Sequence, residues 1–69
     1  MKISARNVLK GKVVQVTKGA VNSEVLLELP GGLQIVSVIT NSSVDHLGLK
    51  AGVDALAVIK ASNVMVAVD

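Results

Sequence analysis

The segment LQIVSVITNSSVDHLGLKAG, residues 33–52, decides the fold because a strand pattern gives way to a helix pattern inside it. Its first eight residues are rich in β-branched side chains, which favour strands. Beyond them the apolar spacing changes to i and i+3, which is the spacing of one helix face. Ser42-x-x-Asp45 resembles a capping box, and Gly48 suits the left-handed end of a helix. We therefore predict a strand followed by one or two helical turns.

Turn signals divide the rest of the chain into further strands. Pro30-Gly31-Gly32 lies between two apolar runs and predicts a hairpin, whereas the slip in alternation from Val13 to Val14 predicts a β-bulge. The expected strands cover residues 7–16, 21–29, 33–40 and 53–61, with a short closing strand in 62–69. An OB-type Greek-key barrel has five strands and carries its helix between strands 3 and 4. The prediction is thus an all-β, five-stranded OB-type barrel with one short helix, forming a single domain over residues 1–69.

The composition is too apolar for a solvated monomer of this length. Of the 69 residues, 51% are hydrophobic and 17% are charged, and the mean hydropathy is +0.63. A chain this short buries only about 60% of the surface that its unfolded form exposes, and it has no cysteine with which to form disulfides. Segments 33–40 and 53–61 carry apolar side chains on both strand faces. We therefore predict a homo-oligomer in which another chain covers these faces.

The residue inventory argues against several classes of function. There is no Phe, Trp or Tyr on which single-stranded nucleic acid could stack, so the net charge of +2 is weak evidence for nucleic-acid binding. His46 has no evident nucleophile or orienting partner, and Glu24 and Glu28 fit a solvated strand face. No stretch has the pattern of a signal peptide or of a membrane span. We expect a cytoplasmic protein with no enzymatic activity, no cofactor, and no nucleic-acid or membrane partner.

Three short polar clusters combine positive charge with hydroxyl groups. Ser4 and Arg6 are two residues apart, as are Lys60 and Ser62, so each pair shares one face of an extended chain. Residues 40–43 gather hydroxyls at the point where the strand enters the helix. Arg binds two oxygens at once, Lys adds a point charge, and hydroxyls donate to the remaining oxygens. Together these groups suit a small oxyanion.

Each cluster also has an ordinary structural interpretation. Ser42 or Thr40 can cap the helix, Arg6 can be solvated near the terminus, and Lys60 can be a strand-edge lysine that discourages aggregation. The turn at residues 19–22 can present backbone N–H groups as an anion-binding nest, or it can be an ordinary hairpin turn. Periodicity does not decide between these alternatives.

Four stretches together resemble the molbindins, the small Mop-domain proteins of molybdate binding. These are SARNVLKGKV (4–13), KGAVN (18–22), VITNSSVDHLGL (38–49) and AVIKASNVMVAV (57–68), so the likeness extends over essentially the whole chain, as in the stand-alone form of the family. The resemblance implies a hexamer built as a trimer of dimers, with each subunit an OB-type barrel. It also implies intracellular storage or buffering of molybdate, or of tungstate.

The same resemblance implies two kinds of intersubunit site. Carried over by position, the first kind uses Ser4, Arg6, Thr40, Ser43, Lys60 and Ser62, with the Ala61 backbone as a further contributor. The second kind uses the turn of Ala20, Val21 and Asn22. His46 has no role in this scheme. Two alternative functions remain, a nucleic-acid-binding OB module and a purely structural oligomerisation module.

Overall fold

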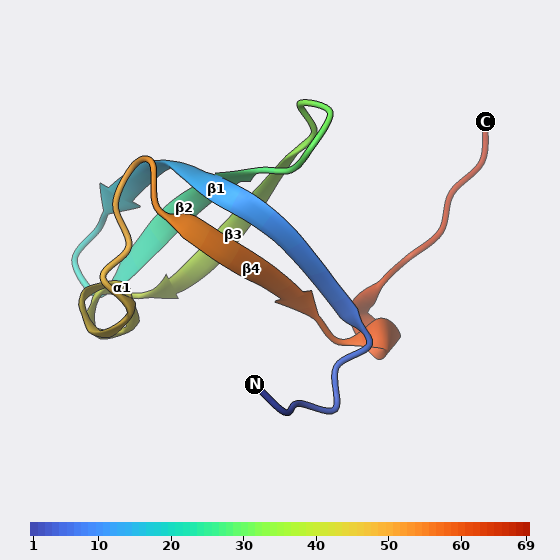
Figure 1. Cartoon of the computed structure of the whole chain (residues 1–69), viewed down its shortest axis with the longest axis horizontal. Coiled ribbons are helices and arrows are strands. Elements are labelled where there is room, and N and C mark those ends of the chain that lie inside the picture. Colours follow the sequence, from blue (N-terminus) through green and yellow to red (C-terminus); the bar gives the residue numbers. More distant parts are fainter.

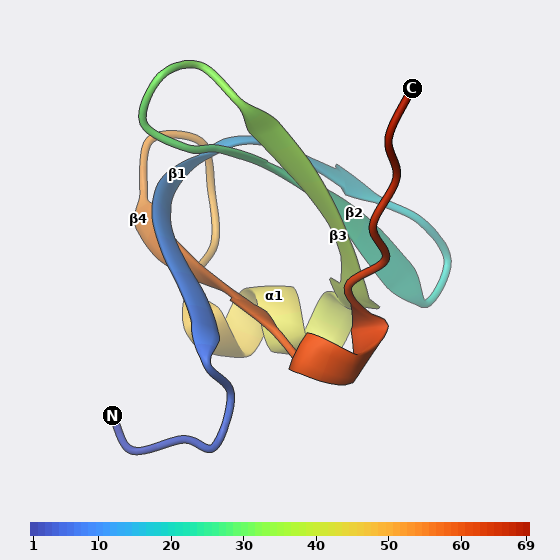
Figure 2. The same ribbon diagram turned by 90° about the vertical axis from the view of Figure 1, so that its right-hand side faces the viewer.

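The computed structural model describes residues 1–69 and contains four strands, one α-helix and one 3₁₀ turn. The elements in chain order are β1 (Asn7–Lys18), β2 (Asn22–Glu28), β3 (Gln34–Thr40), α1 (Asn41–Leu47), β4 (Asp54–Ile59) and η1 (Ala61–Asn63). The strands form one antiparallel sheet in the order β3-β2-β1-β4. The sheet curls strongly, and α1 lies across the space between its two edges (Figure 1, Figure 2). The predicted all-β class and the helix between strands 3 and 4 are confirmed.

β1 changes its pairing partner along its length. Its first half pairs with β4 through residues 7–12, and its second half pairs with β2 through residues 12–18. The register with β2 shifts between Val13 and Gln15, so the predicted bulge is present. Backbones also approach closely at Gly11, where an added Cβ would lie 2.7 Å from the Glu28 carbonyl oxygen. The bulge and this small residue let one strand serve both ladders.

The core on the concave side of the sheet is small. It consists of five buried apolar residues from β1, β2, α1 and β4: Val13, Val25, Leu27, Val44 and Ala57. In β2, the predicted alternation is confirmed from Ser23 to Leu27, because Ser23, Val25 and Leu27 are all buried. Val21 and Leu29 were predicted on the same inward face, but Val21 lies in a turn and is exposed, and Leu29 is half-buried.

β3 and β4 carry apolar side chains on both faces, as predicted. Ile35 and Ile39 pack against the core, whereas Val36 and Val38 point outward, and Val36 is 56% exposed. An apolar cavity of about 590 Å³ also lies between the edge strands β3 and β4. A chain of 69 residues therefore leaves much of its apolar surface uncovered.

The helix ends agree with the sequence prediction at one terminus and differ at the other. Gly48 ends α1 in the left-handed conformation, with φ of 65°, as predicted. The capping box at Ser42 is wrong, because the N-cap is Thr40, whose side chain accepts a hydrogen bond from the Ser43 N–H. The helix starts directly after β3, so Thr40 is the last extended residue and Asp45 lies beyond the first turn. None of the helices has the length and hydropathy needed to cross a bilayer.

The predicted fifth strand in residues 62–69 is absent. Residues 61–63 form η1, and residues 64–69 continue without any ladder partner, with Val66 90% exposed. Figure 1 shows this segment leading away from the sheet. A strand requires a neighbouring strand to satisfy its backbone groups, and within one chain this segment has none. Both sheet edges, β3 and β4, consequently remain unpaired.

The bulge makes two adjacent valines unequal, which gives a direct test of the register. Val13 is 2% exposed in the core, whereas Val14 is 38% exposed. Val13→Ala should lower the free energy of unfolding by about 2 kcal/mol, because two buried methyl groups are lost and a cavity remains. Val14→Ala should cost well under half as much. Chemical denaturation at one protein concentration measures both, and equal losses would contradict the observed register.

Candidate functional site

The two cationic residues of the predicted site, Arg6 and Lys60, lie at the same end of the β1–β4 ladder. The ladder's last pair is Asn7 and Ile59, and the Asn7 side chain donates a hydrogen bond of 3.2 Å to the Ile59 carbonyl oxygen. Arg6 directly precedes this pair and Lys60 directly follows it. The antiparallel register therefore brings together two segments that are more than fifty residues apart in sequence. We call residues 4–6 and 60–62 the cationic end.

Neither cation at this end has an acidic partner. The two ion pairs of the structure are Lys12–Asp54 and Lys18–Asp45, and both lie elsewhere. Arg6 and Lys60 are exposed and make no side-chain hydrogen bond within the chain. Two uncompensated positive charges at one ladder end repel each other, and an anion between them removes that repulsion.

The hydroxyls of Thr40 and Ser43 form a pair at the start of α1. Thr40 Oγ1 accepts from the Ser43 backbone N–H at 3.1 Å and donates to Ser43 Oγ at 2.8 Å. The hydroxyl proton of Ser43 has no acceptor within the chain. Thr40 is thus occupied as a helix cap, and Ser43 is the free donor of the pair.

The turn that carries Ala20, Val21 and Asn22 lies against the same helix. It is closed by a hydrogen bond of 2.8 Å from the Gly19 N–H to the Asn22 carbonyl, which confirms the predicted turn. Asn22 is opposite Thr40 in the β2–β3 register. We call this turn, together with Thr40 and Ser43, the helix end.

The two ends are far apart within one chain. Figure 1 shows α1 and the β1–β2 turn at one extreme of the long axis, and η1 with the start of β1 toward the other. The molecule extends 35 Å along that axis. The structure therefore places Ser4, Arg6, Lys60, Ala61 and Ser62 in one group, and it places Thr40 and Ser43 with Ala20, Val21 and Asn22 in another. A first-kind site made of all its predicted residues does not exist in a single chain.

Sequence reasoning missed the residues that tie the helix end together. The Asn41 side chain contacts Gly19 and Ser23, and Lys18 forms an ion pair of 2.8 Å with Asp45. Asn41 stood out in the sequence only as one polar residue within 40–43. Its position immediately after a Thr cap was the available signal, since Asn is a poor helix former.

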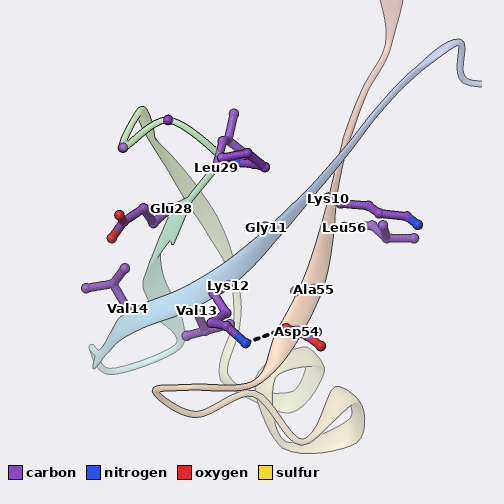
Figure 3. Close-up of a pocket in the computed structure, with 13 residues that line it drawn as sticks. Lys10, Gly11, Lys12, Val13, Val14, Glu28, Leu29, Asp54, Ala55 and Leu56 are labelled. Atoms are coloured by element: carbon purple, nitrogen blue, oxygen red, sulfur yellow. Dashed lines mark hydrogen bonds and ion pairs between the residues drawn. The ribbon is translucent and has the colours of Figure 1, made fainter.

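A cavity of about 800 Å³ lies away from both ends (Figure 3). It is formed around Gly11, the β2–β3 hairpin and the start of β4. At its lower side Lys12 forms an ion pair of 2.9 Å with Asp54, and the hydrogen bond and positive charge of Lys12 lower the pKa of that carboxyl. No residue of the predicted sites lines this cavity. The structure also has no group of three or more His, Cys, Asp or Glu side chains that could hold a metal ion.

Comparison with known families assigns the chain. Residues 3–66 match the TOBE domain. The chain belongs to the TOBE domain family. Among its TOBE relatives, molybdenum-pterin-binding protein 1 of Clostridium pasteurianum is 53% identical over 66 residues, covering 96% of this chain and 97% of the relative. A probable molybdenum-pterin-binding protein of Haemophilus influenzae is 48% identical over the full length of both chains. The resemblance to the Mop-domain proteins is thereby confirmed.

Solved structures of the family share this fold. MopII from Clostridium pasteurianum superimposes with a TM-score of 0.92 at 51% identity, covering 97% of this TOBE chain and all of that one. ModG, described as a cytoplasmic molybdate-binding protein and solved with molybdate bound, gives a TM-score of 0.91 at 54% identity. That match covers 94% of this chain and 46% of the ModG chain.

The cap at Thr40 can be tested by substitution. Thr40→Val removes the side-chain acceptor of the Ser43 N–H, so it should lower the free energy of unfolding by about 1 kcal/mol. Ser42 is exposed and its side chain makes no hydrogen bond. Ser42→Ala should therefore change the free energy of unfolding by less than about 0.5 kcal/mol. Chemical denaturation compares the two variants, and a larger loss for Ser42→Ala would restore the capping box predicted from sequence.

Proposed function

We propose that this protein binds molybdate, or tungstate, as an intact oxyanion at sites shared between the subunits of a homo-oligomer. The assembly is a hexamer built as a trimer of dimers, and each chain contributes one binding domain over residues 1–69. The role is storage or buffering of the oxyanion in the cytoplasm, without catalysis. Molybdate is the ligand of these sites rather than a cofactor, and its oxygens, not its metal, contact the protein.

One observation supports this proposal: a cationic group and a group of neutral hydrogen-bond donors lie at opposite ends of the chain. The cationic end supplies Arg6 and Lys60, which lack a carboxylate partner, together with the hydroxyls of Ser4 and Ser62. The helix end supplies the Ser43 hydroxyl, held by Thr40. Charge-assisted hydrogen bonds from the first half and neutral donors from the second together suit a tetrahedral dianion.

The distance between the halves supports a shared site. One chain does not close on itself, so a complete set of donors forms when the cationic end of one chain meets the helix end of another. The uncovered apolar surface supports such an assembly, because Val36 and Val38 of β3 and the segment 64–69 are exposed. Burying apolar surface between chains stabilises a small domain whose own core is limited.

The chemistry of the chain favours the oxyanion over a pterin. The relatives are named for molybdenum-pterin binding, and ModG is described as binding molybdate. A pterin ring is planar and aromatic, and aromatic side chains are the usual surfaces on which such rings stack. This chain has no aromatic residue, whereas its uncompensated Arg6 and Lys60 suit a compact anion.

The attraction of molybdate to the assembly and its selection over sulfate then have separate causes. Each chain carries a net charge of +2, so six chains carry +12, which raises the local concentration of a dianion. Selection against sulfate comes from size, because donors spaced for the longer metal–oxygen bonds do not all reach the smaller ion. Removing the bound ion from water strengthens each of these contacts.

The cationic end can be tested by charge deletion. Arg6→Ala and Lys60→Ala should each weaken molybdate binding by about tenfold to a hundredfold, the effect of losing one charge-assisted contact of about 1.5–3 kcal/mol. Lys50→Ala is the matched control, because Lys50 is exposed, forms no ion pair and carries the same charge. Calorimetric titration with molybdate, tungstate and sulfate gives the affinities.

Four results, from that titration or from parallel binding assays with oligonucleotides and a pterin, would contradict the proposal. Equal losses in all three variants would indicate general attraction to a basic surface. A parent protein that ignores molybdate but shifts single-stranded oligonucleotides in a gel would be a nucleic-acid module. A stable oligomer with no affinity for either ligand would be a structural module. Binding of a simple pterin in preference to molybdate would show that the ligand is a pterin and not the oxyanion.

Subunit mixing tests whether the sites are shared. One variant carries Arg6→Ala and Lys60→Ala at the cationic end, and another carries Thr40→Val and Ser43→Ala at the helix end. Each assembly alone should bind molybdate weakly. After joint refolding of equal amounts, about one quarter of the first-kind sites should combine an intact cationic end with an intact helix end and regain parental affinity. No regain on mixing would contradict a first-kind site that combines the cationic end of one chain with the helix end of another.

A further inference from the structure

We propose that Asn41 is a positioning residue for the second kind of site, because its side chain holds the turn at residues 19–22 in shape. This inference rests on the proposed function, in which Ala20, Val21 and Asn22 contact the oxyanion. Asn41 itself does not touch the ligand. It acts through the backbone of the turn, and no role for it was evident from the sequence.

Asn41 makes two hydrogen bonds to the turn and a third to Ser23 of β2, the strand that follows it. The Asn41 side-chain amide donates to the Gly19 carbonyl oxygen at 2.9 Å, and its Oδ1 accepts a hydrogen bond from the Ser23 hydroxyl. The Asn41 backbone N–H donates to the Val21 carbonyl at 2.8 Å. A carboxamide both donates and accepts, so one side chain can bridge the start of the turn and the strand that follows it. Ser23 is 1% exposed, and its hydroxyl needs such a partner.

These contacts determine where the amide groups of the turn point. The Gly19 carbonyl and the Ala20 N–H belong to one trans peptide unit, so they point in opposite directions. Because Asn41 holds the carbonyl, the Ala20 N–H points away from the Asn41 side chain. The N–H groups of Ala20 and Val21 have no acceptor within the chain, and both residues are exposed. The turn therefore presents two free backbone donors in a fixed orientation, as an anion requires.

A second contact supports this arrangement. Lys18, at the start of the turn, pairs with Asp45 of α1 at 2.8 Å, which offsets the negative charge of that carboxylate. Both side chains are more than half exposed, so the pair adds little stability by itself. Of the contacts that hold the turn against α1, those of Asn41 are therefore the stronger ones.

The first test needs no ligand. Amide hydrogen exchange followed by NMR compares the parent protein with Asn41→Ala, and with Ser42→Ala as the control at the next helix position. In Asn41→Ala the Gly19 N–H, which closes the turn on Asn22, should exchange at least about tenfold faster, while the β1–β4 ladder keeps its protection. Unchanged exchange at Gly19 would overturn the inference.

The second test follows molybdate by residue in the same NMR spectra. In the parent protein, added molybdate should shift the amide signals of Ala20, Val21 and Ser43. In Asn41→Ala the affinity reported by Ala20 and Val21 should fall about tenfold or more, whereas the affinity reported by Ser43 should stay within about threefold. A purely structural role would lower both affinities together, and a residue without a role would lower neither; each result would overturn the inference.

A further variant covers the case in which Asn41→Ala does not fold. Asn41→Gln keeps the amide chemistry but is one methylene longer, so it misplaces the same donor and acceptor and should show the same selective loss. A parent protein in which molybdate shifts no signal would contradict the proposed function itself. The exchange comparison would then still decide whether Asn41 positions the turn.

Discussion

The architecture depends on the way in which β1 pairs with two strands in succession. This single strand of twelve residues pairs with β4 through its first half and with β2 through its second half. The bulge after Val13 lets the strand bend between the two ladders. Where each ladder stops decides the surface chemistry. The β4 ladder stops at Asn7 and Ile59, which places Arg6 beside Lys60, and the β2 ladder stops where the turn at residues 19–22 begins. Register therefore sets the positions of Arg6, Lys60 and the turn at residues 19–22.

The two ends of the molecule are prepared for a ligand in different ways. At the helix end, hydrogen bonds from Thr40 and Asn41 orient neutral donors before any ligand arrives. At the cationic end, Arg6 and Lys60 have no partner that orients or neutralises them. In the proposed assembly, an oxyanion bridges an ordered neutral surface on one chain and an unsatisfied charged surface on another. Such a ligand binds the assembled protein and not the separated chains, so ligand binding and assembly stabilise each other.

Much of the fold could be predicted because it is encoded locally. Alternation of apolar residues indicated the strands, its slip at Val13 indicated the bulge, and Gly48 marked the C-terminus of α1. Each of these features depends on a few adjacent residues. The strand predicted in 62–69 failed because local pattern reports the tendency to be extended but not the presence of a neighbour. The predicted N-cap at Ser42 was wrong for a related reason. Both Thr40 and Ser42 can cap a helix, and only the end of β3 decides between them.

The sequence by itself determined the chemistry of this protein: a small, apolar, β-rich chain without aromatics, with Arg6 and Lys60 flanked by hydroxyls, in the pattern of the Mop-domain family. Only the tertiary structure decided how that chemistry is distributed. It separated the cationic end from the helix end, and it joined Asn41 to a turn about twenty residues earlier in the chain. The physical reason is that side-chain type and local periodicity are properties of neighbouring residues. Register between distant strands is settled by the pairing and packing of the whole chain.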